Sequence, residues 1–161
     1  MKQGGKILAE ILNKLSLEIK AGITTWDLEE KARQLIKEYP GAAPAFLGYE
    51  GYPAILCVSV NYEVVHSIPR KENIIKPGDV VNIDLGIKYK GLITDSALTV
   101  LVPGGNPNEI AIKKKLIQVT KESLYKGINR AQIGNTIGDI GSAVQRHAYD
   151  NNFSVIYELV G

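Results

Sequence analysis

Alternation of apolar and polar positions along its first strand makes the stretch from residue 79 to 100 the clearest pattern in the chain. Its first half places apolar side chains at every second position, Val81, Ile83, Leu85 and Ile87. This period of two is typical of a strand that is buried on one face. Lys90-Gly91 supplies a turn, and the second half returns as another strand. The stretch therefore predicts an antiparallel hairpin.

Apolar residues at helical spacing predict two helices before this hairpin and two after it. Thr24, with Asp27 three residues later, indicates a capping box at the start of the second helix. The helices are expected at about 6–20, 25–39, 107–126 (ending at Gly127) and 136–150. Further strands are expected at about 54–60, 63–67 and 153–160. These elements predict an α+β fold of two layers, with an antiparallel sheet and helices packed on one face.

A short motif in the first half of the chain recurs in the second half. Gly22-x-Thr24-x-x-Asp27-Leu28 is repeated as Gly134-x-Thr136-x-x-Asp139-Ile140. Each copy links one helix to the next and caps the second helix, which favours a duplicated unit. The first repeat would cover about 6–102 and a partial second repeat about 107–161. Because no low-complexity linker separates them, we expect a single domain over 1–161.

Composition places the chain among ordinary globular proteins, with 45% hydrophobic and 22% charged residues. The net charge of +2 is too small to argue for nucleic acid or an anionic membrane as a partner. One cysteine, Cys57, excludes an intramolecular disulfide and favours a reducing compartment. No apolar run is long enough to span a bilayer, so the expected location is the cytoplasm.

Two acids in the hairpin, Asp84 and Asp95, are the strongest candidates for chemistry. If the turn centres between Tyr89 and Lys90, these aspartates lie directly opposite each other. Like charges so placed repel, and aspartate is a poor strand former. A cation between the carboxylates would explain the pair. The alternative is that both acids lie on a solvated face of the sheet or cap a turn.

Four segments, taken in order, resemble the type I methionine aminopeptidases, which have the pita-bread fold. The resemblance covers nearly the whole chain. The segments are Gly48-Tyr49-Glu50-Gly51-Tyr52-Pro53, Cys57-Val58-Ser59-Val60-Asn61, Val64-Val65-His66-Ser67-Ile68-Pro69, and Asn82-Ile83-Asp84 with Thr94-Asp95-Ser96.

This resemblance implies a hydrolase that removes N-terminal methionine from nascent proteins and peptides. The family holds two divalent metals with two aspartates, one histidine and two glutamates, and Asp84 and Asp95 match the aspartates. The metals activate a water that attacks the peptide carbonyl. Oxygen ligands with one imidazole suit Co, Mn, Fe or Zn.

The resemblance also implies roles for side chains around the metals. His66 matches the catalytic histidine that contacts the substrate and helps to stabilise the tetrahedral intermediate. Asn61 and Glu63 match a loop that binds a monovalent cation in some relatives. The pocket for the methionine side chain would be lined by Phe46, Tyr49, Tyr52 and Cys57.

The chain also departs from the family pattern. Ser67 stands where the family has glycine after the histidine. The family continues past Gly161 with the metal-binding histidine and the two glutamates, and this sequence does not contain them. His147, expected to be exposed on a helix, does not match the missing ligand. We therefore expect the isolated chain to be inactive or weakly active.

Three interpretations stay open. The chain is the N-terminal portion of a methionine aminopeptidase, with its C-terminal portion lost or supplied in trans. Alternatively, it is a non-catalytic pita-bread relative that binds peptides or partners, although two facing carboxylates argue against this. In the third, it self-associates across the missing strands and brings four aspartates together. A proline-specific exopeptidase is the nearest enzymatic alternative, and the tyrosine-rich loop favours methionine.

Overall fold

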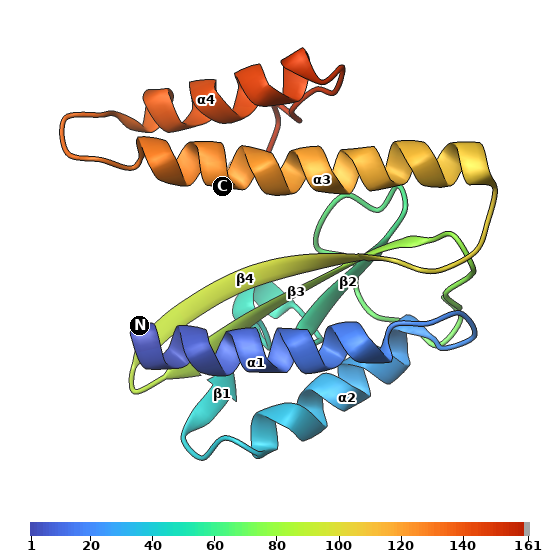
Figure 1. Ribbon diagram of the computed structural model, residues 1–161. Helices are drawn as coiled ribbons and strands as arrows, with labels where there is room; N and C mark the ends of the chain where they lie inside the picture. The colour runs from blue at the N-terminus through green and yellow to red at the C-terminus, as the bar shows by residue number, and fades with distance from the viewer. Residues whose placement is uncertain (160–161) are drawn as a thin grey trace. The chain divides into compact units, whose positions relative to one another are not determined.

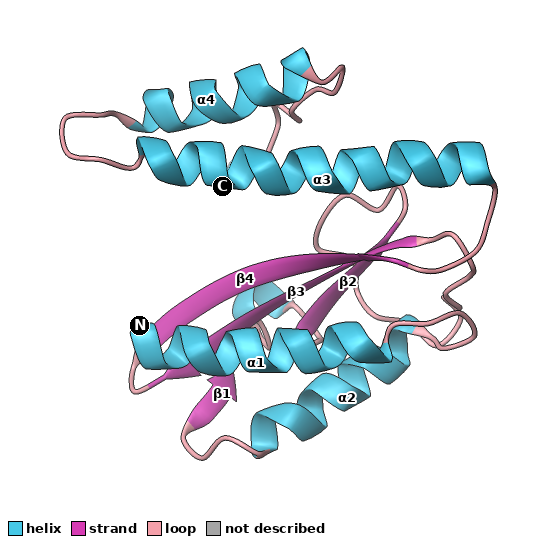
Figure 2. Cartoon of the chain, in the orientation of Figure 1, coloured by secondary structure: helices cyan, strands magenta, loops and turns pink. Residues whose placement is uncertain are grey.

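The computed structural model describes residues 1–159 and divides them into two compact units, 1–106 and 107–159 (Figures 1 and 2). The boundary falls near the one expected between the two repeats, while the duplication and the single domain stay predictions. The first unit contains α1 (Lys2–Glu18), α2 (Thr25–Lys37), β1 (Ala42–Pro44), the short 3-10 helix η1 (Tyr49–Gly51), β2 (Leu56–Val60), β3 (Val80–Tyr89) and β4 (Leu92–Leu101). The second contains α3 (Pro107–Arg130) and α4 (Ile137–Asp150).

The core of the first unit lies between the two helices and one face of the sheet. β3 is the central strand, with β4 along one edge and β1 and β2 along the other, all antiparallel. Burying each of the larger apolar side chains contributes roughly 1.5–3 kcal/mol. The expected α+β fold, with helices on one face of an antiparallel sheet, is confirmed here. The fully buried side chains include Leu8, Ile11 and Leu15 of α1, Leu28 of α2, and Ile83, Leu85 and Ile87 of β3.

The hairpin register differs from the sequence prediction. Lys90 and Gly91 form a two-residue turn with φ of 50° and 79°, and the flanking residues pair as Tyr89 with Leu92. Positive φ at both central residues is the geometry that matches the twist of a tight hairpin. Because the turn centres one residue later than expected, Asp84 pairs with Ala97, and Asp95 pairs with Gly86. The predicted direct opposition of the aspartates was wrong, and they are diagonal neighbours on one face.

Side chains satisfy the backbone along the outer edge of β2. The N–H of Leu56 donates to Glu29 at 3.0 Å, and the Leu56 carbonyl accepts from the Tyr52 hydroxyl at 3.1 Å. Farther along, the N–H of Val60 donates to Glu63 at 2.9 Å. These bonds fix where β2 starts and ends, and hence which residue of β2 faces Asp84.

The strand expected at 63–67 is absent, because this segment is irregular. Asn61 and His66 have φ of 55° and 58°, which interrupts an extended conformation at two points. One backbone bond ties the segment to β2, from the N–H of Val58 to the Ser67 carbonyl at 3.0 Å. The prediction followed the apolar side chains and missed these two left-handed residues.

The second unit is a pair of helices that lie side by side (Figure 1). The Thr136 capping box is present, with the hydroxyl of Thr136 accepting from the N–H of Asp139. α3 does not end at Gly127 as predicted. That glycine is buried, and a Cβ there would lie 3.1 Å from Val144 of α4, so it permits close helix packing.

The end of the chain contains no strand over 153–159, so that prediction was wrong for the described residues. Val160, the last residue of the predicted strand, lies outside them. Within 1–159, none of the helices combines the length and the apolar character that crossing a membrane requires.

Candidate functional site

The site begins with Asp84 in the middle of β3, on the face opposite the apolar core. Its cross-strand neighbours are Cys57 on β2 and Ala97 on β4. Asp95 lies on the same face of β4, two residues before Ala97. Period-two alternation puts all four side chains on this face, because their neighbours Ile83 and Leu85 fill the core.

The two carboxylates are coupled electrostatically. Burial raises the pKa of Asp84, and the charge of Asp95 and a hydrogen bond with it raise that pKa further, to about 7. The Oδ1 atom of Asp84 is buried and has no hydrogen-bond partner among the described residues. A buried acceptor without a donor is unfavourable, and a cation would compensate both the charge and the missing bond.

Both carboxylates fit a divalent metal as part of a ligand set. Carboxylate oxygens suit the hard cations, and one of these oxygens is buried without a partner. Over residues 1–159, no group of three or more His, Cys, Asp or Glu side chains could hold a metal ion. Asp84 and Asp95 therefore supply two side chains, which is fewer than a dinuclear centre needs.

Cys57 and Tyr52 lie beside the aspartates. Cys57 is 4% exposed, and burial raises the pKa of its thiol, as do the charges of Asp84 and Asp95, while a hydrogen bond with Tyr52 opposes the rise. Burial also raises the pKa of the Tyr52 hydroxyl, which donates to the carbonyls of Leu56 and Ser67 at 3.1 and 3.3 Å. A neutral thiol and a neutral phenol thus form one wall of the site.

Phe46 forms another part of the site by lying against Gly86. A Cβ built on Gly86 would be 2.6 Å from the Phe46 ring, which no real side chain tolerates. Gly86 is also the direct partner of Asp95. The ring therefore approaches the sheet next to the aspartates because this position has no side chain.

Tyr49 and His66, the other predicted site residues, are exposed. Tyr49 is 69% exposed in η1, and His66 lies in the irregular segment after β2 with φ of 58°. The next residue, Ser67, is half-buried, and its carbonyl accepts the bonds from Val58 and Tyr52. The structure thus brings five predicted residues together, Asp84, Asp95, Cys57, Tyr52 and Phe46, of which Asp95 is exposed to solvent. Tyr49 and His66 lie at the surface outside this group.

The side chains of the predicted cation loop are engaged within the protein. Asn61 donates to Asp79 at 2.9 Å and accepts from the N–H of Val80 at 3.1 Å. Glu63 accepts from the N–H of Val60 and pairs with Arg70 at 2.8 Å. These contacts hold the loop, and a monovalent cation bound by its backbone stays a prediction.

Glu29 is a supporting residue that sequence reasoning missed. It is fully buried, and its carboxylate accepts from the N–H groups of Ile55 and Leu56 at 3.0 Å each and pairs with Arg33 at 2.6 Å. The signal was an acid within the apolar stripe of α2, next to Leu28.

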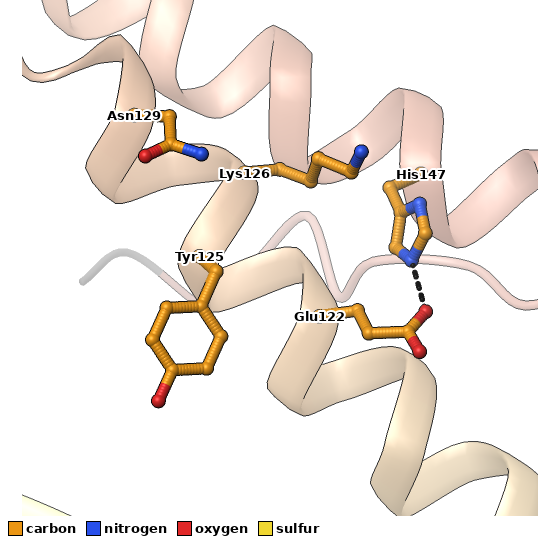
Figure 3. Close-up of a pocket in the computed structure, with 5 residues that line it drawn as sticks. All are labelled: Glu122, Tyr125, Lys126, Asn129 and His147. Atoms are coloured by element: carbon orange, nitrogen blue, oxygen red, sulfur yellow. Dashed lines mark hydrogen bonds and ion pairs between the residues drawn. The ribbon is translucent and has the colours of Figure 1, made fainter.

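Two cavities of the structure lie away from the aspartates. One of about 470 Å³ is lined by Glu63, Arg70, Glu72 and Asn73. The other, of about 290 Å³, lies between α3 and α4 and is lined by Glu122, Tyr125, Lys126, Asn129 and His147 (Figure 3). His147 was expected to be exposed, but its side chain is only 19% exposed and its Nε2 lies 2.9 Å from Glu122. This contact with α3 accounts for its partial burial.

Comparison with known proteins gives a consistent result. The family model described as metallopeptidase family M24 matches residues 1–161. A methionine aminopeptidase of Aquifex aeolicus is 43% identical and methionine aminopeptidase 1 of Bacillus subtilis 42% identical, each over 100% of this chain but 63% and 62% of their own lengths. The solved methionine aminopeptidase of Thermotoga maritima is 38% identical with a TM-score of 0.92, over 100% of this chain and 63% of its own.

More distant structures share the fold alone. The Xaa-Pro dipeptidase of Bacillus anthracis is 16% identical with a TM-score of 0.73, over 92% of this chain and 39% of its own. The chain spans about six-tenths of the length of the curated relatives reported above.

Proposed function

Because the chain belongs to metallopeptidase family M24 and has a partial pita-bread fold, we propose that it is the N-terminal portion of a methionyl aminopeptidase. The observation that carries this proposal is the carboxylate pair of Asp84 and Asp95 on the hairpin face away from the core, with one buried oxygen that has no donor among the described residues. The similarity to methionine aminopeptidases over the whole chain supports methionine rather than proline chemistry.

Each residue of the site has a role in this proposal. Asp84 and Asp95 bind the divalent metal ions, which supply Lewis acidity toward water and the peptide carbonyl when they are bound. Cys57, Phe46 and Tyr52 receive the methionine side chain, since aromatic rings and a neutral thiol suit a thioether. His66, exposed beside the site, contacts the substrate peptide and donates a hydrogen bond as the reaction proceeds.

The isolated chain is inactive or weakly active in this proposal. Two carboxylates provide too few ligands to fix two metals, and residues 1–159 contain no group of three or more side chains that could hold a metal ion. The remaining ligands would come from a portion of the protein that corresponds to the four-tenths of the relatives left uncovered.

A chimaera tests this function. The present chain is joined to the portion of Bacillus subtilis methionine aminopeptidase 1 that the match leaves uncovered. Methionine release from a Met-Ala-Ser peptide is measured with Mn, Co, Fe or Zn, beside the isolated chain and an Asp95→Asn chimaera. We expect release from the chimaera and little from the other two. Release that persists in Asp95→Asn, or cleavage of Xaa-Pro peptides instead, would contradict the proposal.

A further inference from the structure

The His66 segment, residues 61–70, contains two residues in an unfavourable backbone conformation. Asn61 and His66 have φ of 55° and 58°, a region that residues other than glycine seldom adopt. Such conformations persist only where the surrounding contacts hold them, and they gather at functional sites. The contacts that hold the His66 segment therefore decide how firmly the imidazole is placed.

Glu63 ties the start of this segment to the end of β2. Its carboxylate Oε2 accepts from the N–H of Val60 at 2.9 Å, and its own N–H donates to the Val60 carbonyl at 3.2 Å. The other carboxylate oxygen, Oε1, lies 2.8 Å from Nη2 of Arg70. One carboxylate thus bonds to β2 on one side of His66 and to Arg70 on the other.

The backbone of Arg70 is itself fixed to the start of α2. Its N–H donates to the Thr25 hydroxyl at 2.9 Å, and its carbonyl accepts from that hydroxyl at 3.1 Å and from the N–H of Trp26 at 3.3 Å. Thr25 is fully buried, so this end of the His66 segment is anchored to the core of the first unit. The guanidinium therefore reaches Glu63 from a backbone that is already held in place.

We propose that the ion pair of Glu63 and Arg70 positions His66 for the reaction, an inference that rests on the function proposed above. The pair joins side chains seven positions apart in the chain, and His66 lies between them. Closing a loop in this way removes conformational freedom from the residues inside it. Glu63 and Arg70 do not touch the substrate in this proposal, and they act through the placement of the imidazole.

The surroundings of the pair set the size of its effect. The Glu63 side chain is 26% exposed and the backbone of Val60 already holds it, so it loses little rotational freedom when it pairs. The Arg70 side chain is 57% exposed, so water weakens the attraction. Pairs this exposed change an equilibrium by about twofold to fivefold. We therefore expect a modest loss of rate when the pair is removed, and no unfolding.

Nuclear magnetic resonance of the chain with ¹⁵N-labelled histidine tests the positioning and needs no activity. The chain has two histidines, so the backbone signal of His147 on α4 is an internal reference. The heteronuclear NOE of each signal reports motion on the ps–ns timescale. In Arg70→Gln the His66 value should fall and the His147 value should not change, because only the ion pair is lost and the backbone bonds to Thr25 remain. Arg70→Lys keeps the charge and should keep the wild-type value.

Lys14→Gln is the matched control for this measurement. It also removes an exposed ion pair, between Lys14 of α1 and Glu38 at 2.6 Å, but that pair does not contact the His66 segment. The His66 signal should therefore be the same in Lys14→Gln as in the wild type. Equal His66 values in the wild type and Arg70→Gln, or an equal fall in Arg70→Gln and Lys14→Gln, would overturn the proposal.

The chimaera described above tests the effect on the reaction. Arg70→Gln should lower kcat and kcat/KM for the Met-Ala-Ser peptide equally, by about twofold to fivefold, and leave KM unchanged. Equal losses are the pattern of an interaction that matters only in the transition state. A rise in KM with an unchanged kcat would contradict a role in positioning His66.

Combining the substitutions tests whether Glu63 and Arg70 act as a pair. Glu63→Gln keeps an amide oxygen that can accept from Val60, so it should lower kcat as Arg70→Gln does. The double variant should be no slower than either single variant, because each one already removes the ion pair. Losses that multiply would overturn the proposal. A wild-type chimaera without activity would contradict the proposed function instead, and the histidine signals would still decide whether the pair positions His66.

Discussion

Gly86→Ala is the substitution whose effect follows most directly from the geometry of the site. A Cβ at this position would lie 2.6 Å from Cε1 and 3.0 Å from Cδ1 of Phe46, and 3.0 Å from Cβ of Ala45. Contacts at 2.6 Å do not occur for real Cβ atoms, so the ring must move. One methyl group would thus displace Phe46 from the sheet beside the aspartates.

The expected cost of Gly86→Ala is about 1–3 kcal/mol of unfolding free energy, as for other overpacked positions. Most of the clash is with Phe46, so the cost should shrink when the ring is absent. In the Phe46→Ala background, Gly86→Ala should cost about 1 kcal/mol less, a coupling typical of residues in contact. The contact with Ala45 would remain.

Urea unfolding followed by the fluorescence of Trp26 measures this cost. Trp26 is the chain's one tryptophan and lies in α2, so its signal reports on the first unit. Gly5→Ala is a matched control, because a Cβ there meets nothing within 4 Å and alanine favours a helix by about 1 kcal/mol. The control should therefore be stabilised. A Gly86→Ala variant as stable as the wild type, or equally destabilised with and without Phe46, would refute the reasoning.

Three further predictions concern carboxylates. Glu29→Gln should lower the unfolding free energy by about 2–4 kcal/mol in the same urea assay, because the buried carboxylate that pairs with Arg33 and accepts two backbone N–H groups loses its charge. An unchanged urea midpoint would contradict this. Asp84→Asn should stabilise the metal-free chain above neutral pH, because it removes the repulsion between Asp84 and Asp95. In thermal unfolding, added Mn²⁺ should stabilise the wild type and not this variant. Equal stabilisation of the wild type and the variant by Mn²⁺ would count against the metal site. Hydrogen bonds from the backbone and hydroxyl of Thr24 lower the pKa of Asp27. The carboxylate therefore contributes to folding stability above its unfolded pKa of about 3.9, and this stability is lost as the pH falls through the lower pKa of the folded state. An NMR titration of Thr24→Ala should show this pKa rising part of the way, since the backbone bond remains, and an unmoved pKa would argue against the assignment.

Local rules predicted the elements that depend on neighbouring residues. The two capping boxes at Thr24 and Thr136 are both present. The alternation around Asp84 correctly placed it on the face away from the core, because a period of two fixes the side of each residue. The aspartates could therefore be assigned to one face from the sequence.

Features set by distant contacts or unusual backbone conformations were missed. Lys90 adopts a positive φ, which lysine rarely does, so the turn centres one residue later than predicted. The aspartates are therefore diagonal neighbours and not directly opposite each other. Gly127 was interpreted as a helix end, although it serves helix packing. The placement of Cys57 across from Asp84 depends on the pairing of β2 with β3, which no local pattern reveals.

Binding of Mn²⁺ to the purified chain, followed by electron paramagnetic resonance, tests the central claim most directly. The wild type is compared with Asp84→Asn, Asp95→Asn and the control Asp150→Asn, which makes the same change at an exposed position of α4. We expect the wild type and the control to bind alike, and both site variants to lose affinity by more than about tenfold. Unchanged affinity in both site variants would contradict a metal site built on this carboxylate pair.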